Sequence, residues 1–321
     1  MEKEILMQAR GITKEFKATG GIVHAVSGVD LDIYAGETLA LVGESGCGKS
    51  TLGKVLLRLI PPTAGSIQFD GEDLTAMNNK QLRQARQKMQ LIFQDPYASL
   101  DPRMNVGQII AEPLRAYKIY KNEKDEEERV RALMDKVGIR SEFYRRYPHQ
   151  FSGGQRQRVG IARALALNPK LIVCDEPVSA LDVSIQAQIL NLLHDLQKEL
   201  NLTYLFISHD LSVVRYISNR VCVMFLGKVC EIRDTESLYS SPCHPYTRFL
   251  LESTPQPDPE KRKEDKELLM GEIPSPINPP SGCRFHPRCP YAKEICSKEE
   301  PTLQPCPGGM CARHFPLKQE I

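Results

Sequence analysis

A glycine-rich segment near the start of the chain carries the side chains best suited to chemistry. It reads Gly43-Glu-Ser-Gly-Cys-Gly-Lys49-Ser50-Thr51, after an apolar run over 38–42 and before a helical pattern. The glycines let the backbone curl until several N–H groups face one point, and the helix N-terminus adds positive potential there. A chance turn is the alternative, but the flanking elements favour a phosphate-binding loop. The residues expected to hold a nucleotide are Gly43, Ser45, Gly46, Cys47, Gly48, Lys49, Ser50 and Thr51.

Two carboxylates end a second apolar run, Leu171-Ile-Val-Cys-Asp175-Glu176. In a chain with a phosphate loop, Asp175 and the Ser50 hydroxyl are expected to hold Mg²⁺, and Glu176 is expected to polarise an attacking water. Lys49 is expected to reach the β- and γ-phosphates. Acidic residues follow many strands, so these two carboxylates alone are a weak signal. They indicate a nucleotide site because a phosphate loop precedes them in the chain. Together they predict hydrolysis of ATP with Mg²⁺.

A second candidate anion site lies between these two elements, at the start of a helical pattern over 156–165. One interpretation is a flexible turn, but a helix start with a serine and exposed N–H groups also attracts anions. A chain with two such sites predicts a nucleotide bound between two chains. The residues expected to face the partner's nucleotide are Ser152, Gly153, Gly154 and Gln155.

The elements that must position these residues alternate between short buried strands and amphipathic helices, which predicts an α/β fold. A segment at roughly 100–155 is expected to be mainly helical. The expected strands are 38–42, 171–174 and 204–207, and the expected helices are 126–137, 156–165, 182–200 and one from the loop through Leu59.

Length and charge exclude several classes of protein. The chain has 321 residues, with 42 basic and 40 acidic side chains and a net charge of +2. This balance gives no electrostatic reason to expect a nucleic-acid partner. Apolar runs are far shorter than a membrane span, and the start lacks the features of a secretory signal. We therefore expect a cytosolic protein that reaches a membrane only through a partner.

The motifs and their order resemble the ATP-binding subunits of ABC transporters over nearly the whole chain. Ser152-Gly-Gly-Gln155 matches the family signature, with Phe151 in place of the commoner Leu. The resemblance implies that Gln94, Glu176 and His209 are catalytic. The roles that it implies for Gln94 are γ-phosphate sensing, a place among the Mg²⁺ ligands beside Ser50 and Asp175, and communication with membrane subunits. It implies a place in the loop that crosses the dimer interface for Asp182, a switch role for His209, and adenine stacking for Phe16.

This resemblance also implies the architecture. We expect an α/β P-loop ABC ATPase core with an N-terminal antiparallel β part, a helical subdomain and a small Cys-rich C-terminal appendage. The ATPase domain is expected to cover residues 1–254, and a linker and the appendage are expected to cover 255–321.

Segments that begin at Phe93, Ser241 and Ile273 are similar to the oligopeptide/dipeptide importer branch, and the last is typical of its F-type subunit. The resemblance implies a motor subunit that energises import of oligopeptides or dipeptides at the cytoplasmic face of the cell membrane. The implied partners are a second, different ATPase subunit, two membrane permease subunits and, indirectly, a substrate-binding protein.

Three rival functions stay open. A soluble ABC ATPase of translation or DNA repair is disfavoured, because the chain has one core and no coiled-coil insertion between Ser50 and Ser152. A transporter for nickel or another small solute is the second rival, because the cargo pocket lies in different chains. The third is a redox-sensing C-terminal segment with the ATPase as its output.

Five of the ten cysteines fall within 283–311, although a reducing cytosol argues against disulfides. The resemblance implies a 4Fe-4S cluster in this segment. Its expected ligands are Cys283, Cys289, Cys296 and Cys311. Cys306 is the rival fourth ligand, because His314 stands two residues later than in the family pattern. A zinc site and a segment without any metal also stay open.

Overall fold

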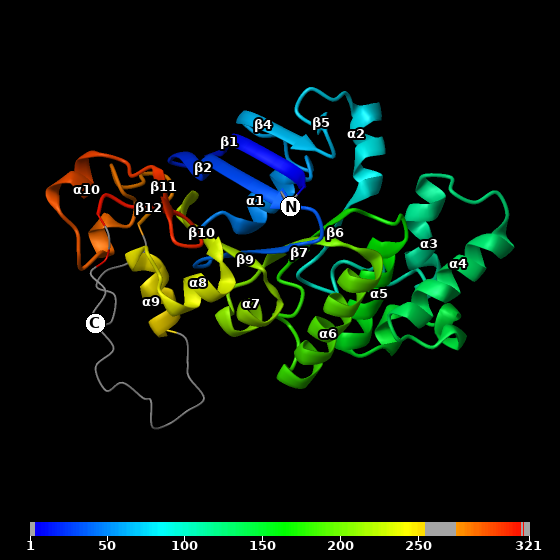
Figure 1. Cartoon of the computed structure of the whole chain (residues 1–321). Helices are drawn as coiled ribbons and strands as arrows, with labels where there is room; N and C mark the ends of the chain where they lie inside the picture. Colours follow the sequence, from blue (N-terminus) through cyan, green and yellow to red (C-terminus); the bar gives the residue numbers. More distant parts are fainter. Residues whose placement is uncertain (1–3, 254–273, 316, 318–321) are drawn as a thin grey trace. The chain divides into compact units, whose positions relative to one another are not determined.

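The computed structural model describes residues 4–253, 274–315 and 317. They fall into two units, one made of Met1–Ala76 with Ile207–Ile321 and the other of Met77–Phe206. Figure 1 shows the elements of each unit. The linker predicted after residue 254 lies outside the described residues. No helix in the described ranges is both long and apolar enough to cross a bilayer.

The first unit contains a four-stranded antiparallel sheet in the order β2-β1-β4-β5. Its strands are β1 (Ile5–Ala18), β2 (Gly21–Tyr34), β4 (Ala64–Phe69) and β5 (Glu72–Asp73). Apolar side chains of β1 such as Met7 and Ala9 are fully buried, whereas Gln8 between them is partly exposed. This alternation is what a sheet with one covered face requires.

The same unit holds a second group of strands in the order β11-β12-β10-β9-β3. They are β3 (Thr38–Val42), β9 (Arg220–Phe225), β10 (Lys228–Asp234), β11 (Leu303–Cys306) and β12 (Gly309–Ala312). The helices of this unit are α1 (Lys49–Leu56), α7 (Leu211–Ile217), α8 (Thr235–Ser240), α9 (Pro245–Ser253), the 3-10 turn η5 (His286–Arg288) and α10 (Glu294–Lys298). β3 runs parallel to β9, and all five residues of β3 are buried. The β11–β12 hairpin pairs with β10, so the C-terminal segment extends the strands that carry the phosphate loop.

The second unit contains strands in the order β8-β7-β6, together with helices. Its strands are β6 (Met89–Ile92), β7 (Leu171–Asp175) and β8 (Thr203–Ile207). Its helices are α2 (Asn79–Ala85), η1 (Arg86–Lys88), α3 (Val106–Ala116), α4 (Glu123–Lys136), η2 (Ser141–Arg145), η3 (Pro148–Gln150), α5 (Gly153–Leu165) and α6 (Val183–Leu200). β6 and β7 are parallel, which agrees with the expected α/β fold.

Most predicted elements are confirmed, but several helix ends differ. The helix predicted from residue 156 begins at Gly153, and that predicted from residue 126 begins at Glu123. Capping explains both shifts, because Ser152 accepts from the backbone of Gln155 and Asn122 caps α4 in the same way. The helix after the phosphate loop ends at Leu56, three residues before the predicted end at 59.

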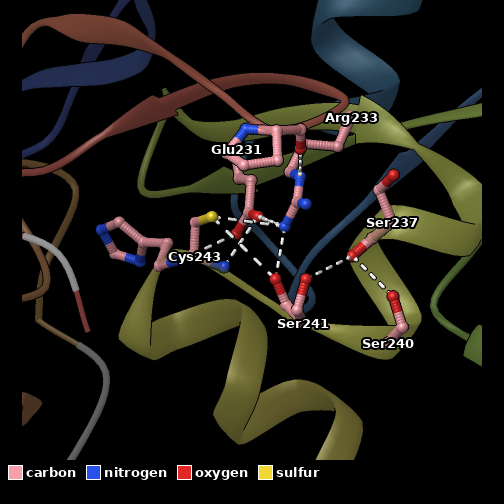
Figure 2. Close-up of polar contacts among 8 residues, drawn as sticks. Glu231, Arg233, Ser237, Ser240, Ser241 and Cys243 are labelled. Carbon is pink, nitrogen blue, oxygen red and sulfur yellow. Dashed lines mark hydrogen bonds and ion pairs between the residues drawn. The ribbon is translucent and has the colours of Figure 1, made fainter. Parts of the chain in front are cut away.

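A buried ion pair fixes the C-terminal hairpin to β10 (Figure 2). Glu231 is 0% and Arg233 1% exposed, and Arg233 Nη1 lies 3.2 Å from Glu231 Oε1. Arg233 Nε donates to the Pro307 carbonyl at 2.8 Å. The Glu231 carboxylate accepts from the backbone N–H groups of Cys243 and His244, both at 2.9 Å. Both charges are thus paired and hydrogen-bonded, which is the condition for burying them at all.

We predict that Arg233→Met destabilises this unit by about 3–5 kcal/mol, because it leaves Glu231 buried without a countercharge. Urea unfolding at neutral pH measures the change. Arg140→Met is the matched control: Arg140 and its partner Glu142 are 78% and 64% exposed, so the loss is expected to be below about 1 kcal/mol. Equal stabilities of the two variants would contradict the prediction.

The neighbouring His244 makes the fold sensitive to acid. Burial lowers its pKa to about 4, and its Nδ1 accepts from the Tyr246 N–H at 3.1 Å. The pKa of a histidine in an unfolded chain is about 6.5. Between this pKa and the folded-state pKa of about 4, the unfolded chain binds the proton and the folded chain does not. This contribution to stability is therefore full above about pH 6.5 and is lost as the pH falls towards 4.

We predict that, between pH 7 and pH 4.5, the free energy of unfolding of the wild type falls by up to about 3 kcal/mol more than that of the His244→Asn variant. Asparagine keeps an acceptor for the Tyr246 N–H but does not titrate. Unfolding free energies measured at both pH values test this. Parallel pH profiles for the two proteins would show that His244 is not the sensitive group.

Candidate nucleotide site

The phosphate loop joins β3 to α1 and has no room for side chains at two of its glycines. Gly43 has φ +148°, and a Cβ there would lie 2.1 Å from the Met224 carbonyl oxygen. Gly48 has φ +104°, and its Cβ would lie 2.1 Å from the Ala25 carbonyl oxygen. The backbone path of the loop is thus fixed by neighbouring strands and is available only to glycine at these positions.

Lys49 lies folded back over this loop. It is 5% exposed, and its Nζ donates to the carbonyls of Gly43 at 2.8 Å and Glu44 at 2.9 Å. Gly227 N–H donates to the Cys47 carbonyl at 2.8 Å, which ties the loop to the β9–β10 turn. The ammonium is therefore held beside the N-terminus of α1, where an anion is attracted.

The remaining residues predicted at the site in this unit lie on separate elements. Ser45 and Gly46 are exposed at the tip of the loop, Cys47 is buried, and Ser50 and Thr51 are half-buried in the first turn of α1. Phe16 on β1 is 38% exposed, with Lys14 Nζ 5.0 Å from its ring centroid. His209 is exposed just before α7, which Asp210 caps.

In the second unit, the chain fold brings Gln94 to Glu176. Gln94 Nε2 donates to Glu176 Oε2 at 2.9 Å across 82 residues of sequence. Glu176 has a left-handed backbone with φ +48°, a conformation that costs a non-glycine residue about 1 kcal/mol or more and that clusters at functional sites. Asp175, at the end of β7, is only 6% exposed. The strand end thus presents two carboxylates, the second held by a neutral amide.

At the start of α5, Ser152 and Gln155 are exposed, Gly153 is half-buried and Gly154 is buried. Ser152 Oγ accepts from Gln155 N–H at 3.3 Å, and the Gln155 side chain accepts from Ser152 N–H at 3.0 Å. A Cβ on Gly154 would lie 2.4 Å from Ile185 Cγ2, so α6 packs directly against this turn. Asp182, before α6, is exposed and makes no capping hydrogen bond with its side chain.

Three residues at the loop are not predicted by the sequence patterns. The Glu44 carboxylate is held by Arg288, at 2.8 and 3.1 Å, and the Glu44 N–H donates to Tyr246 Oη at 2.8 Å. Glu44 lies within the glycine-rich motif, but the motif assigns it no role. No local pattern marks Arg288 or Tyr246, which lie more than 200 residues away in sequence.

The iron–sulfur prediction, and with it any metal site at these cysteines, is wrong. Among the residues that the structure describes, no group of three or more His, Cys, Asp or Glu side chains is placed to hold a metal ion. Cys283 and Cys289 pack against an apolar cluster, whereas Cys311 lies on β12 opposite Glu231. Burial raises the pKa of Cys289 to about 11 and raises that of Cys311 as well, as expected for thiols packed as small apolar groups.

The fold and the phosphate loop define an ATP-binding cassette, and comparison with known proteins agrees. The family model described as "ABC transporter" matches residues 26–179, and "Oligopeptide/dipeptide transporter, C-terminal region" matches 230–296. The dimeric post-hydrolysis structure of the ATP-binding cassette MJ0796, bound to ADP and Pi, is 30% identical with a TM-score of 0.66. It covers 71% of this chain and 98% of that one.

Curated relatives narrow the class. The oligopeptide transport ATP-binding protein AppF of Bacillus subtilis is 51% identical over 313 residues, 94% of each chain. OppF of Salmonella typhimurium is 54% identical over 283 residues, 88% of this chain and 85% of that one. The chain therefore belongs to the oligopeptide-transport group of ABC transporter ATP-binding proteins. The predicted family, fold class and ATPase activity are confirmed.

Alanine substitution distinguishes a loop glycine that has no room for a side chain, such as Gly48, from one that has room, such as Gly46. We predict that Gly48→Ala costs about 3 kcal/mol or more in folding or ATP binding, because its Cβ meets the Ala25 carbonyl. Gly46→Ala meets nothing within 4 Å and bears only its left-handed strain, about 1–2 kcal/mol. Unfolding and ATP titrations of both variants test the difference, and equal losses would contradict the packing argument.

Proposed function

We propose that this chain hydrolyses ATP to energise import of oligopeptides or dipeptides through an ABC transporter. The observation that carries the cargo class is the similarity to oligopeptide-transport relatives over about nine-tenths of the chain, C-terminal region included. The phosphate loop and the Gln94–Glu176 pair support the ATPase chemistry.

In this proposal the chain's own residues position the reacting groups. The loop N–H groups and Lys49 bind the ATP phosphates, and Phe16 stacks on adenine. Glu176 accepts a proton from the attacking water while Gln94 orients its carboxylate. Ser50, Gln94 and Asp175 offer hard oxygen donors of the kind that Mg²⁺ prefers. When bound there, Mg²⁺ would neutralise charge on the phosphates.

The proposal includes a second ATPase subunit. Ser152 and Gln155 at the start of α5, and Asp182 before α6, are exposed in this chain. An exposed helix start suits the phosphates of a nucleotide on a partner's loop. We propose that this partner is a different ATPase, so that the pair is a heterodimer, and that His209 acts as the switch residue.

The proposed membrane partners are two permease subunits, fed by a substrate-binding protein, with this chain at the cytoplasmic face. Two aromatic side chains near Gln94 support a docking surface there: Phe93 is 45% and Tyr97 is 61% exposed. Exposed aromatic area of this kind is typical of interaction sites. The division into a domain at 1–254 and an appendage at 255–321 is likewise a proposal.

We predict that Glu176→Gln abolishes uptake of labelled peptides. ATP still binds, but ATP turnover falls about 100-fold or more, because the glutamine amide cannot accept the proton from water. The measurement is peptide uptake by cells that carry the variant as the sole copy, with ATP turnover by the purified transporter complex. Glu142→Gln is the matched control, an exposed glutamate in the same unit. Normal peptide uptake by the Glu176→Gln cells would refute the proposed function.

A further inference from the structure

The C-terminal segment reaches the phosphate loop through a two-pronged ion pair. Arg288 Nη1 lies 2.8 Å from Glu44 Oε2, and Arg288 Nη2 lies 3.1 Å from Glu44 Oε1. The two side chains are 7% and 20% exposed. Both carboxylate oxygens of Glu44 are therefore engaged by one guanidinium, in the geometry that binds a carboxylate most strongly.

The backbone of Glu44 is held as well. Its N–H donates to Tyr246 Oη at 2.8 Å, and its carbonyl accepts from Lys49 Nζ at 2.9 Å. Tyr246 is fully buried, with ring centroids of Phe225 and Phe285 at 4.8 and 5.3 Å. Glu44 is thus held through its carboxylate, its backbone N–H and its backbone carbonyl.

The residues that hold Glu44 are themselves anchored. Arg284, four residues before Arg288, donates to the Leu226 carbonyl and, at 2.9 Å, to Ser27 Oγ. Tyr246 follows the segment that the Glu231–Arg233 pair fixes, and the same pair holds the C-terminal hairpin (Figure 2). The C-terminal segment therefore presents Arg288 to the loop from a framework that hydrogen bonds join to the core.

A glutamate in a loop that binds phosphate is an electrostatic conflict. Its charge opposes the anion that the loop N–H groups and Lys49 attract, and at a partly buried site a unit charge acts over several ångströms. We propose that Arg288 is a positioning residue for ATP: it neutralises Glu44 and holds that carboxylate away from the phosphates. Through it the C-terminal segment sets the ATP affinity of the core. This rests on the proposed function only in taking ATP as the ligand of the loop.

The test measures ATP binding to the full chain by titration calorimetry with variants of both residues. Arg288→Gln is expected to raise the Kd for ATP about tenfold, because Glu44 is left uncompensated. In the Glu44→Gln background the same substitution is expected to change the Kd less than about threefold, because no charge needs neutralising.

Glu300→Gln is the matched control. Glu300 forms an ion pair with Lys228, and this contact also joins the C-terminal segment to the core. Unlike the Arg288 pair, it does not involve Glu44. Its ATP affinity is expected to equal that of wild type.

The double variant separates electrostatics from damage to the fold. A loss of affinity in Arg288→Gln that persists fully in Glu44→Gln/Arg288→Gln would overturn the proposal, as would wild-type affinity in Arg288→Gln. If Arg288→Gln does not fold, Arg288→Lys decides: it keeps the charge, and a tenfold loss of affinity there would overturn neutralisation as the mechanism. Failure of the peptide-uptake test would leave this result standing, because the readout is ATP binding alone.

Discussion

The site depends on one constraint: the backbone of the phosphate loop runs so close to its neighbours that two positions admit no side chain. Gly43 lies against the Met224 carbonyl and Gly48 against that of Ala25. These carbonyls belong to β9 and β2, elements formed by residues far apart in sequence. The N–H groups of the loop can converge on an anion only while both strands stay in place, so loop geometry is a property of the whole unit.

Two glutamates lie at functional segments of this chain, and the structure treats them differently. Glu44 is paired with the Arg288 guanidinium, which balances its negative charge. Glu176 accepts a hydrogen bond from the neutral amide of Gln94, which orients the carboxylate but brings no countercharge. A carboxylate that must accept a proton needs the second arrangement, whereas one that must not repel phosphate needs the first.

Local patterns in the sequence predicted the elements well, because hydrophobic periodicity and a glycine-rich turn are properties of adjacent residues. They placed β3, β7, β8 and α6 to within a residue or two and identified the phosphate loop. Contacts between distant segments were not predictable in this way: Arg288 and Glu44 are separated by 244 residues. The iron–sulfur expectation, which the family resemblance implied, failed for a related reason, since the resemblance does not reveal that Cys311 is a buried strand residue paired with β10.

The C-terminal segment has little apolar core of its own, and its described part is ordered by joining the core. Its hairpin covers the edge of β10, and Cys283, Cys289 and Phe285 pack into the apolar cluster of that unit, the thiols acting as small apolar groups. The segment in turn supplies Arg288 to the loop. Coupling of this kind is reciprocal: if the docked segment favours ATP binding, then bound ATP must favour the docked segment by the same free energy. An element that looks like an appendage in sequence is therefore energetically part of the nucleotide site.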